Sequence, residues 1–271
     1  MSYKIGFTSI YPTEKKKEYA SIMQDIPCAP RKSVVQVRFP GRGMDLAYYN
    51  DKFDLKVGDM VYVDGKLEGL LGRVTQVNYN FKIKLSDYKR VIALVDTNVH
   101  GHFRMAGSHF VTLDRETLPA HKVRLWFVAP TDEDDEIVCG SDDTAFSLDD
   151  LSGMNISPDI AERGHEYYKQ NKVVYICVDG AKGYAIVQGS EAYEVEFDYR
   201  NREISNLTCS CFCSFNCKHE FAAMLQLRET LEWICEHCEE EYNRSEYFAA
   251  ISKGALFAFA VDGKDDGGFT L

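Results

Sequence analysis

The feature that constrains this chain most is the segment CSCFCSFNCKH at positions 209–219, which holds four cysteines and one histidine. Cys209 and Cys211 lie two residues apart at the end of a predicted strand, so their side chains point to the same side. Cys217 and His219 have the same spacing at the start of a predicted helix. Three thiolates and one imidazole are a donor set that closed, tetrahedral zinc sites use. The sequence therefore predicts one bound Zn²⁺ with the ligands Cys209, Cys211, Cys217 and His219.

Cys213 leaves alternatives open, because it lies inside the loop between the two pairs. It could replace Cys211 or Cys217 in the metal shell, or it could belong to a redox pair. The surrounding chain favours metal: six of the nine cysteines fall between positions 209 and 238, unlike the spread-out framework of a secreted disulfide protein. The first residues also lack the basic-then-apolar pattern of a signal peptide, so we expect a reducing, cytoplasmic location.

The other cysteines and histidines give weaker signals. Cys235 and Cys238 form a C-x-x-C pair within a predicted helix, where we expect them to pack in the core rather than to form a second metal site or a redox pair. The remaining candidates have no matched partners, and we expect no metal role for them: Cys28, Cys139, Cys177, His100, His102 and His109.

The pattern around the cluster predicts a domain over residues 154–271. Ser157 and Pro158 are typical of a helix start, and three alternating segments, VVYICVDG, KGYAIVQG and AYEVEFDY, predict a meander of strands. A long helix is expected from residue 218 to 242, with one apolar face. The later run GALFAFAV predicts a buried strand.

This arrangement resembles the SWIM-type zinc finger, in which C-x-C, five residues and C-x-H lie on a strand–loop–helix frame. The resemblance extends upstream to a helix with a G-x-x-Y-Y-like motif, here Gly164, Tyr167 and Tyr168, followed by a β-meander. It covers residues 155 to 230 and implies metal ligands at the same four positions. It also implies a nucleic-acid-associated setting rather than an activity of this chain.

Residues 1–130 predict a second, β-rich domain. Short strands are expected at SVVQVRF, DMVYV, GLLGRVTQVNY, RVIALV and KVRLWFVA, separated by tight turns. This pattern is typical of a small barrel of SH3-like or OB-like type. The stretch KVGDMVYVDGKLEGLLGRVTQV is weakly similar to KOW-like modules of RNA-associated proteins. The predicted fold class is thus α+β, with a barrel-like domain followed by a meander-and-helix zinc domain.

The charge is divided unequally between the halves. Residues 1–130 carry 20 Lys and Arg against 13 Asp and Glu, a balance of +7, whereas residues 131–271 carry 11 against 29, a balance of −18. The segment 131–153 is rich in acid, and we expect a solvated linker there; the alternative is a mimic of nucleic-acid charge that lies across the basic half.

Two functions fit this division. The first is a non-catalytic, zinc-binding protein that contacts DNA or RNA through its basic half, where aromatic residues alternate with positive charge. The second is an adaptor whose acidic zinc domain recruits a basic protein partner. An enzyme is not expected, since no catalytic motif is present and a four-ligand zinc site has no open position. Removing a ligand is expected to unfold the C-terminal part and leave residues 1–128 folded. The candidate nucleic-acid contacts are Arg38, Arg42, Arg73, Lys82, Lys84, Lys89 and Arg90.

Overall fold

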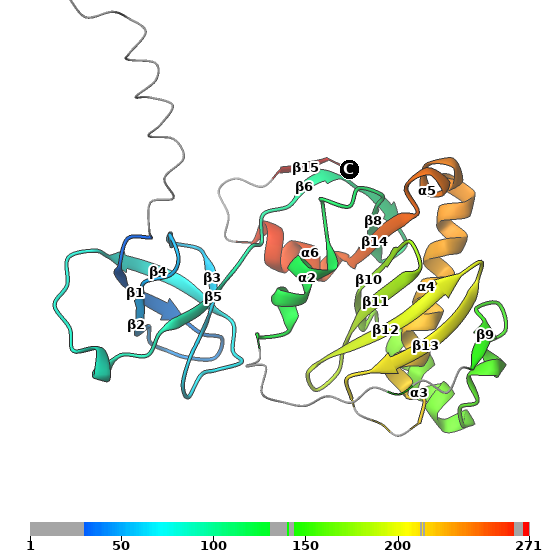
Figure 1. Ribbon diagram of the computed structural model, residues 1–271, viewed down its shortest axis with the longest axis horizontal. Coiled ribbons are helices and arrows are strands. Elements are labelled where there is room, and N and C mark those ends of the chain that lie inside the picture. Colours follow the sequence, from blue (N-terminus) through cyan, green and yellow to red (C-terminus); the bar gives the residue numbers. More distant parts are fainter. Residues whose placement is uncertain are drawn as a thin grey trace, which may run out of the picture.

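The computed structural model describes residues 30–130, 140, 144–211, 213, 215–262 and 268–270. Two sheets organise these residues into a smaller and a larger unit that lie side by side (Figure 1). Helices and mostly antiparallel strands both contribute, which confirms the predicted α+β class. Among the described residues, no helix is both long and apolar enough to cross a membrane.

The smaller unit is a five-stranded antiparallel sheet with the order β2-β1-β4-β3-β5. A bridge between Tyr49 and Arg90 joins its first and last strands, so the sheet curls toward closure. Inward-facing side chains such as Val35, Val61 and Val74 fill the interior. Four of these strands were predicted from their alternating pattern. The strands are β1 (Ser33–Arg38), β2 (Leu46–Asn50), β3 (Met60–Val63), β4 (Gly72–Asn78) and β5 (Val91–Val95), with a short 3-10 turn η1 (Leu85–Asp87) before β5.

The larger unit is built on an eight-stranded sheet with the order β7-β8-β14-β10-β11-β12-β13-β9. Its centre is the predicted meander, in which each strand pairs with the next through a short turn. The strands are β7 (Arg104–Ala106), β8 (His109–Thr112), β9 (Ala145–Ser147), β10 (Val173–Asp179), β11 (Lys182–Gln188), β12 (Ala192–Arg200), β13 (Glu203–Cys209) and β14 (Tyr247–Ser252). A separate parallel pair joins β6 (His100–His102) to β15 (Gly268–Thr270).

The larger sheet crosses the expected division at residue 130. Strand β8 pairs with β14 from Thr112 to His109, so residues expected in the N-terminal domain extend the C-terminal sheet. The local pattern could not show this, because the pairing joins segments more than 130 positions apart. The smaller unit therefore ends near β5, at Val95.

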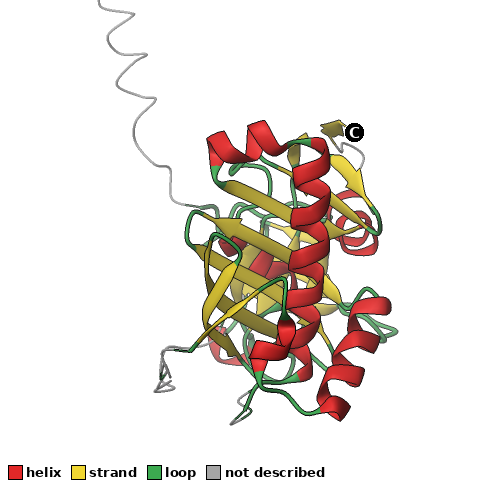
Figure 2. Ribbon diagram, turned by 90° about the vertical axis from the view of Figure 1, so that its right-hand side faces the viewer, coloured by secondary structure: helices red, strands yellow, loops and turns green. Residues whose placement is uncertain are grey.

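Helix α4 covers one face of the larger sheet, and α3 packs against α4 (Figure 2). Helix α3 (Pro158–Lys169) begins where predicted, since the Ser157 side chain caps it and Pro158 occupies its first turn. Helix α4 (Lys218–His237) lies against β10 to β13 and ends at Cys238, after which α5 (Glu239–Ser245) continues in a new direction.

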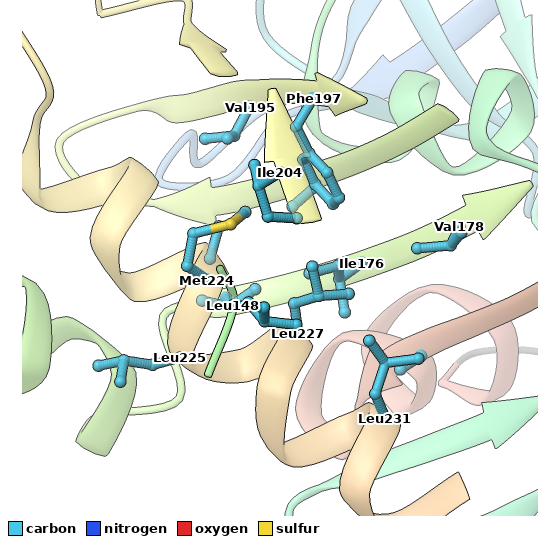
Figure 3. Packing of buried hydrophobic residues seen from close by; sticks show 14 of the residues in the cluster. Leu148, Ile176, Val178, Val195, Phe197, Ile204, Met224, Leu225, Leu227 and Leu231 are labelled. Carbon is cyan, nitrogen blue, oxygen red and sulfur yellow. The ribbon is translucent and has the colours of Figure 1, made fainter. Parts of the chain in front are cut away.

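The core between α4 and the sheet is apolar and closely packed. Figure 3 shows Met224, Leu227 and Leu231 of α4 facing Ile176 and other side chains of the strands. All four are at most 1% exposed. Burial of a large aliphatic side chain is worth about 1.5–3 kcal/mol, so this interface fixes α4 on the sheet.

Helix α3 crosses α4 at the glycine of the G-x-x-Y-Y-like motif. Gly164 is buried, and a Cβ atom there would lie 2.8 Å from the ring of Phe221 and 2.9 Å from the carbonyl oxygen of Lys218. No side chain fits at that distance. The glycine thus lets α3 approach the first turn of α4.

Two predicted strands are wrong, because both segments are helical. KVRLWFVA lies mostly in α2 (Ala120–Phe127), which buries Val123 and Trp126 three residues apart on one face. GALFAFAV lies in α6 (Lys253–Leu256) and the π-helical turn η3 (Phe257–Val261), where the Ser252 side chain caps the start. Both helices lie between the two sheets (Figure 1), and each apolar run is too short for its period to distinguish a helix from a buried strand.

The expected linker is partly folded. Residues 131–139 and 141–143 lie outside the described residues, but β9 adds a strand next to β13. Leu148 is fully buried, and the 3-10 turn η2 (Leu151–Met154) buries Leu151 and Met154. Apolar residues at the end of the acidic segment therefore belong to the core of the larger unit.

The two units share a hydrophobic cluster. Tyr62 and Val95 of the smaller unit pack in one group with Trp126 of α2 and Leu256 of α6. The Tyr62 hydroxyl donates a hydrogen bond to the Leu125 carbonyl at 3.1 Å. The units are thus docked on each other through α2 and α6 rather than separated by a free spacer.

Candidate metal centre

The structure brings the four predicted ligands together. Cys209 ends β13, Cys211 lies in the following turn, and Cys217 and His219 start α4. One donor atom from each residue lies within 4.8 Å of all the others. These atoms are close enough to bind one metal ion, whose identity the geometry does not fix.

The separations suit a tetrahedral site. The Nδ1 atom of His219 lies 3.8 Å from the Cys209 sulfur and 3.7 Å from the Cys217 sulfur. Zn–S and Zn–N bonds of about 2.3 and 2.0–2.1 Å place tetrahedral ligands roughly 3.5–3.8 Å apart. The two nitrogen–sulfur distances thus lie close to this range, and the other donor atoms are at most 4.8 Å apart.

Hydrogen bonds from neighbouring elements hold the turn that carries the ligands. The backbone N–H of Ser210 donates to the Glu194 carbonyl at 2.9 Å, and the Ser210 hydroxyl accepts from the Glu194 N–H at 2.9 Å. On the other side of the loop, the Asn216 side-chain amide donates to the Met154 carbonyl. The loop is thus tied to β12 and to η2 at its two ends.

Aromatic rings enclose His219, which is 5% exposed. The Tyr193 ring stacks on the imidazole, with a centroid distance of 4.1 Å and an angle of 16° between the ring planes. The Tyr167 ring meets it edge-on at 5.5 Å, and the Lys218 ammonium lies over Tyr167 at 4.5 Å. Nδ1 of His219 faces the sulfurs of Cys209 and Cys217, whereas its Nε2 is buried without a hydrogen-bond partner among the described residues.

The start of α4 favours a thiolate at Cys217. The Cys217 sulfur accepts from the backbone N–H of Glu220, and the Glu220 carboxylate accepts from the backbone N–H of Cys217 at 2.6 Å. This reciprocal pair is a capping box. Positive potential at a helix N-terminus also stabilises negative charge.

The pKa values follow from this arrangement. Hydrogen bonding from Cys209, and then from His219 and the Glu220 backbone, lowers the pKa of Cys217 to about 4. The hydrogen bond with Cys217 raises the pKa of Cys209, and burial raises that of Cys211 to about 12. Burial also raises the pKa of Glu220 to about 8. One thiolate is therefore favoured before metal binds, and metal binding would release protons from the other two thiols.

A groove of about 890 Å³ opens beside the cluster. Its lining includes Cys211, Cys213, Tyr193 and Arg163, together with Phe215, whose side chain is 85% exposed. Cys213 itself is exposed and lies outside the four-donor group. The metal-binding cluster is therefore accessible from one side.

The other sulfur and imidazole groups are placed as follows. Cys238 and Cys177 are buried, but Cys235 is exposed, so the prediction that both members of the C-x-x-C pair pack in the core is wrong for Cys235. The helix turns Cys235 outward because the buried positions are Leu231, Ile234 and Cys238. His109 is buried, with Nε2 2.7 Å from the Val173 carbonyl. Cys28 and Cys139 lie outside the described residues.

The seven basic candidates fall into two groups. Three are engaged within the protein: Arg38 with Asp45 at 2.7 Å, Arg90 with Asp51 at 2.6 Å, and Arg73 with the carbonyls of Gly58 and Asp262. The other four have exposed side chains, and three of them lie in the segment that contains η1. These four are Arg42, Lys82, Lys84 and Lys89.

Sequence reasoning missed three parts of the site: the ring of Tyr193, the capping role of Glu220 and the groove. A glutamate three positions after Cys217 is the spacing of a capping box, so Glu220 had a detectable signal. Tyr193 had none, because its contact with His219 depends on the position of the β11–β12 turn.

Comparison with known proteins adds little to this site. No family model matches the chain, and no solved structure matches it. One curated relative, the uncharacterized protein MJ1493 of Methanocaldococcus jannaschii, is 38% identical over 69 residues. The match covers 26% of this chain and 29% of the relative, so the chain spans under a third of that relative's length.

Proposed function

We propose that this chain is a non-catalytic zinc-binding protein that contacts nucleic acid through its five-stranded unit. In this proposal the SWIM-like module is a structural and docking element. The metal-binding part of the proposal rests on one observation: three thiols and one imidazole lie within 4.8 Å of one another.

Zinc is the ion that this donor set favours. Three thiolates and an imidazole form a closed site with no position left for substrate, which is the pattern of structural zinc. The test is elemental analysis of protein purified without added metal, followed by replacement with Co²⁺. One zinc per chain, and a cobalt spectrum with thiolate charge-transfer and tetrahedral bands, would support the assignment. A stoichiometric content of iron instead would refute it.

Charge and exposure support contact with nucleic acid. Residues 30–95 carry 12 Lys and Arg against 7 Asp and Glu, so +5 of the +7 in residues 1–130 belongs to the smaller unit. Lys82 and Lys84 are exposed, and nearby Tyr79 is 38% exposed beneath the Arg31 guanidinium at 4.2 Å from its ring. Exposed lysines neutralise phosphates, and aromatic rings with arginine stack on unpaired bases.

The binding test uses the full chain and two double charge reversals. Labelled single- and double-stranded DNA and RNA are titrated at two salt concentrations, with Lys82→Glu/Lys84→Glu compared with Lys52→Glu/Lys56→Glu. All four lysines are exposed on the same unit, so the two variants change net charge equally. If both lysines contact a single strand, the first variant should reduce the salt slope by about 1.4, since each phosphate contact contributes about 0.7. Equal effects of both variants, or no binding at low salt, would refute the proposal.

A protein adaptor is the second candidate, and the acidic surface of α4 and α5 favours it. Glu232, Glu236, Glu239 and Glu240 are all exposed there, on the unit that carries the negative charge. A basic protein partner would be attracted to this surface in a salt-dependent way. Failure of nucleic-acid binding, together with salt-sensitive capture of a basic protein that Glu236→Lys/Glu240→Lys abolishes, would favour the adaptor.

A further inference from the structure

Cys213 has a chemical setting that the metal site does not use. It lies two residues after Cys211, and both side chains line the groove beside the cluster. The Cys211 thiol is also close enough for its side chain to interact with that of Cys213. A thiol outside the metal-binding group therefore lies next to one inside it.

The accessibility of the sulfurs increases toward the groove. Cys217 is buried, Cys209 and Cys211 are half-buried, and Cys213 is exposed. The reaction of a thiol with a small oxidant requires access to the sulfur as well as thiolate character, so a buried sulfur is protected. An oxidant that enters the groove would thus meet Cys213 first and Cys211 next.

We propose that Cys213 is a peroxide-sensitive thiol that forms a disulfide with Cys211 and thereby releases the metal ion. This inference rests on the metal-binding part of the proposed function. Hydrogen peroxide oxidises the Cys213 thiol to a sulfenic acid and is itself reduced to water. The Cys211 sulfur then attacks the sulfenic sulfur, its bond to the metal breaks, the S–S bond forms, and the hydroxyl leaves as a second water after taking up a proton.

Chain geometry selects Cys211 as the partner. Cα atoms two residues apart are separated by at most about 7 Å, so a small bend of the chain is enough to reach the roughly 4.4–6.8 Å that a disulfide requires. Cys209 is held in β13 by its pairing with Val195, and Cys217 is fixed as the buried cap of α4. Neither sulfur can move away from the cluster toward Cys213 without breaking those contacts.

Loss of Cys211 would weaken metal binding. The remaining donors, Cys209, Cys217 and His219, would leave one tetrahedral position open to water. Because Cys211 lies in a turn rather than in a helix or strand, its departure need not disturb α4. The oxidation would thus couple peroxide to metal release through the loop alone.

The test uses full-length, metal-loaded protein exposed to hydrogen peroxide, with released metal followed by a chromophoric chelator. Cys213→Ser is compared with Cys235→Ser, because Cys235 is the other exposed cysteine among the described residues and lies on α4 outside the cluster. We expect Cys213→Ser to slow release at least about tenfold and Cys235→Ser to match the wild type, since the reaction follows the exposed thiol next to a ligand. Peptide mass spectrometry of the oxidised wild type should show the disulfide between Cys211 and Cys213.

Equal rates of metal release from Cys213→Ser and the wild type would overturn the inference, and so would a disulfide that excludes Cys213. A lower metal content of Cys213→Ser before oxidation would also overturn it, because Cys213 would then be a metal ligand. The metal content of the wild type, measured before peroxide is added, separates these outcomes from failure of the proposed function. A wild type that binds no metal refutes the metal site itself, whereas a fully loaded wild type with unchanged release in Cys213→Ser refutes the switch alone.

Discussion

Replacement of Cys217 by serine isolates the contribution of the metal to stability. Cys217 is the N-cap of α4, and its sulfur accepts a hydrogen bond from the backbone N–H of Glu220. Serine is among the best N-cap residues and can accept the same hydrogen bond. The substitution therefore removes a buried candidate ligand and keeps the helix cap, so a loss of stability would reflect the metal.

The magnitude follows from linkage between binding and folding. A ligand that binds only the folded chain stabilises it by about 4.1 kcal/mol when its free concentration is a thousand times its dissociation constant. For a chain of this size, each kcal/mol shifts the melting temperature by about 2–4 °C. With zinc at that concentration, Cys217→Ser should melt about 8–16 °C below the wild type, and excess chelator should remove the difference.

The assay is thermal unfolding by circular dichroism and calorimetry, in zinc and in chelator, with Cys213→Ser as the matched control. That variant changes an exposed cysteine of the same loop outside the four-donor group, so its melting temperature should stay close to that of the wild type. Equal melting of Cys217→Ser and the wild type in zinc would refute the ligand assignment. A decrease in melting temperature for Cys213→Ser as large as that for Cys217→Ser would also refute the ligand assignment.

The structure changes what this variant should do to the rest of the chain. Sequence reasoning expected residues 1–128 to stay folded while the remainder unfolds. Strand β8 and helix α2 are integral to the larger unit, however, so those residues do not form an independent domain. In addition, α4 is held on the sheet by Met224, Leu227 and Leu231, which are not among the four donor residues. We therefore expect loss of stability and local opening near residue 211 rather than unfolding of half the chain.

Three further substitutions test the fold. Gly183→Ala should destabilise the protein by about 1–3 kcal/mol in chemical denaturation, because a Cβ atom there would lie 2.0 Å from the Phe197 ring across the strand pair. Trp126→Ala should cost about 3–5 kcal/mol and increase proteolysis between the two units, since this ring lies in their shared cluster. Burial lowers the pKa of His109, so its neutral form stabilises the fold above about pH 6.5, and that stability is lost as the pH falls and the unfolded histidine takes up a proton. His109→Gln, whose amide can still donate to the Val173 carbonyl, should flatten the decline of stability between pH 6.5 and 5 relative to wild type; an unchanged slope would contradict this.

The metal cluster and the meander could be predicted from sequence because their determinants are local. Cys209 and His219 are ten positions apart, and each strand of the meander pairs with its sequence neighbour. Alternation and capping residues act over a few positions, so they are visible in one sequence. The pairing of β8 with β14 cannot be predicted from one sequence, since no local signal connects His109 with Ser252.

The segments predicted wrongly share one physical cause. The helices α2 and η3 lie between two sheets, and stacked contacts such as Trp126 with Phe259, 5.3 Å apart, bury apolar residues on more than one side. A short apolar run of this kind cannot be told from a buried strand by its periodicity alone. Both wrongly predicted segments therefore lie at the interface between the units, where the fold depends on residues far apart in the sequence.

This interface has a consequence for how the basic and acidic surfaces act. A freely tethered basic domain would bind nucleic acid independently of the rest of the chain, whereas docking through Tyr62, Trp126 and Leu256 holds the two units in one arrangement. The acidic larger unit then adds a fixed negative field next to the basic surface. Coulombic repulsion of phosphate falls off over about 8 Å at physiological ionic strength, so it acts on strands that extend beyond the smaller unit more than on short ones. If the smaller unit binds nucleic acid, affinity should therefore rise with strand length up to the span of that unit and then level off or fall, and raising the salt concentration should weaken this length limit.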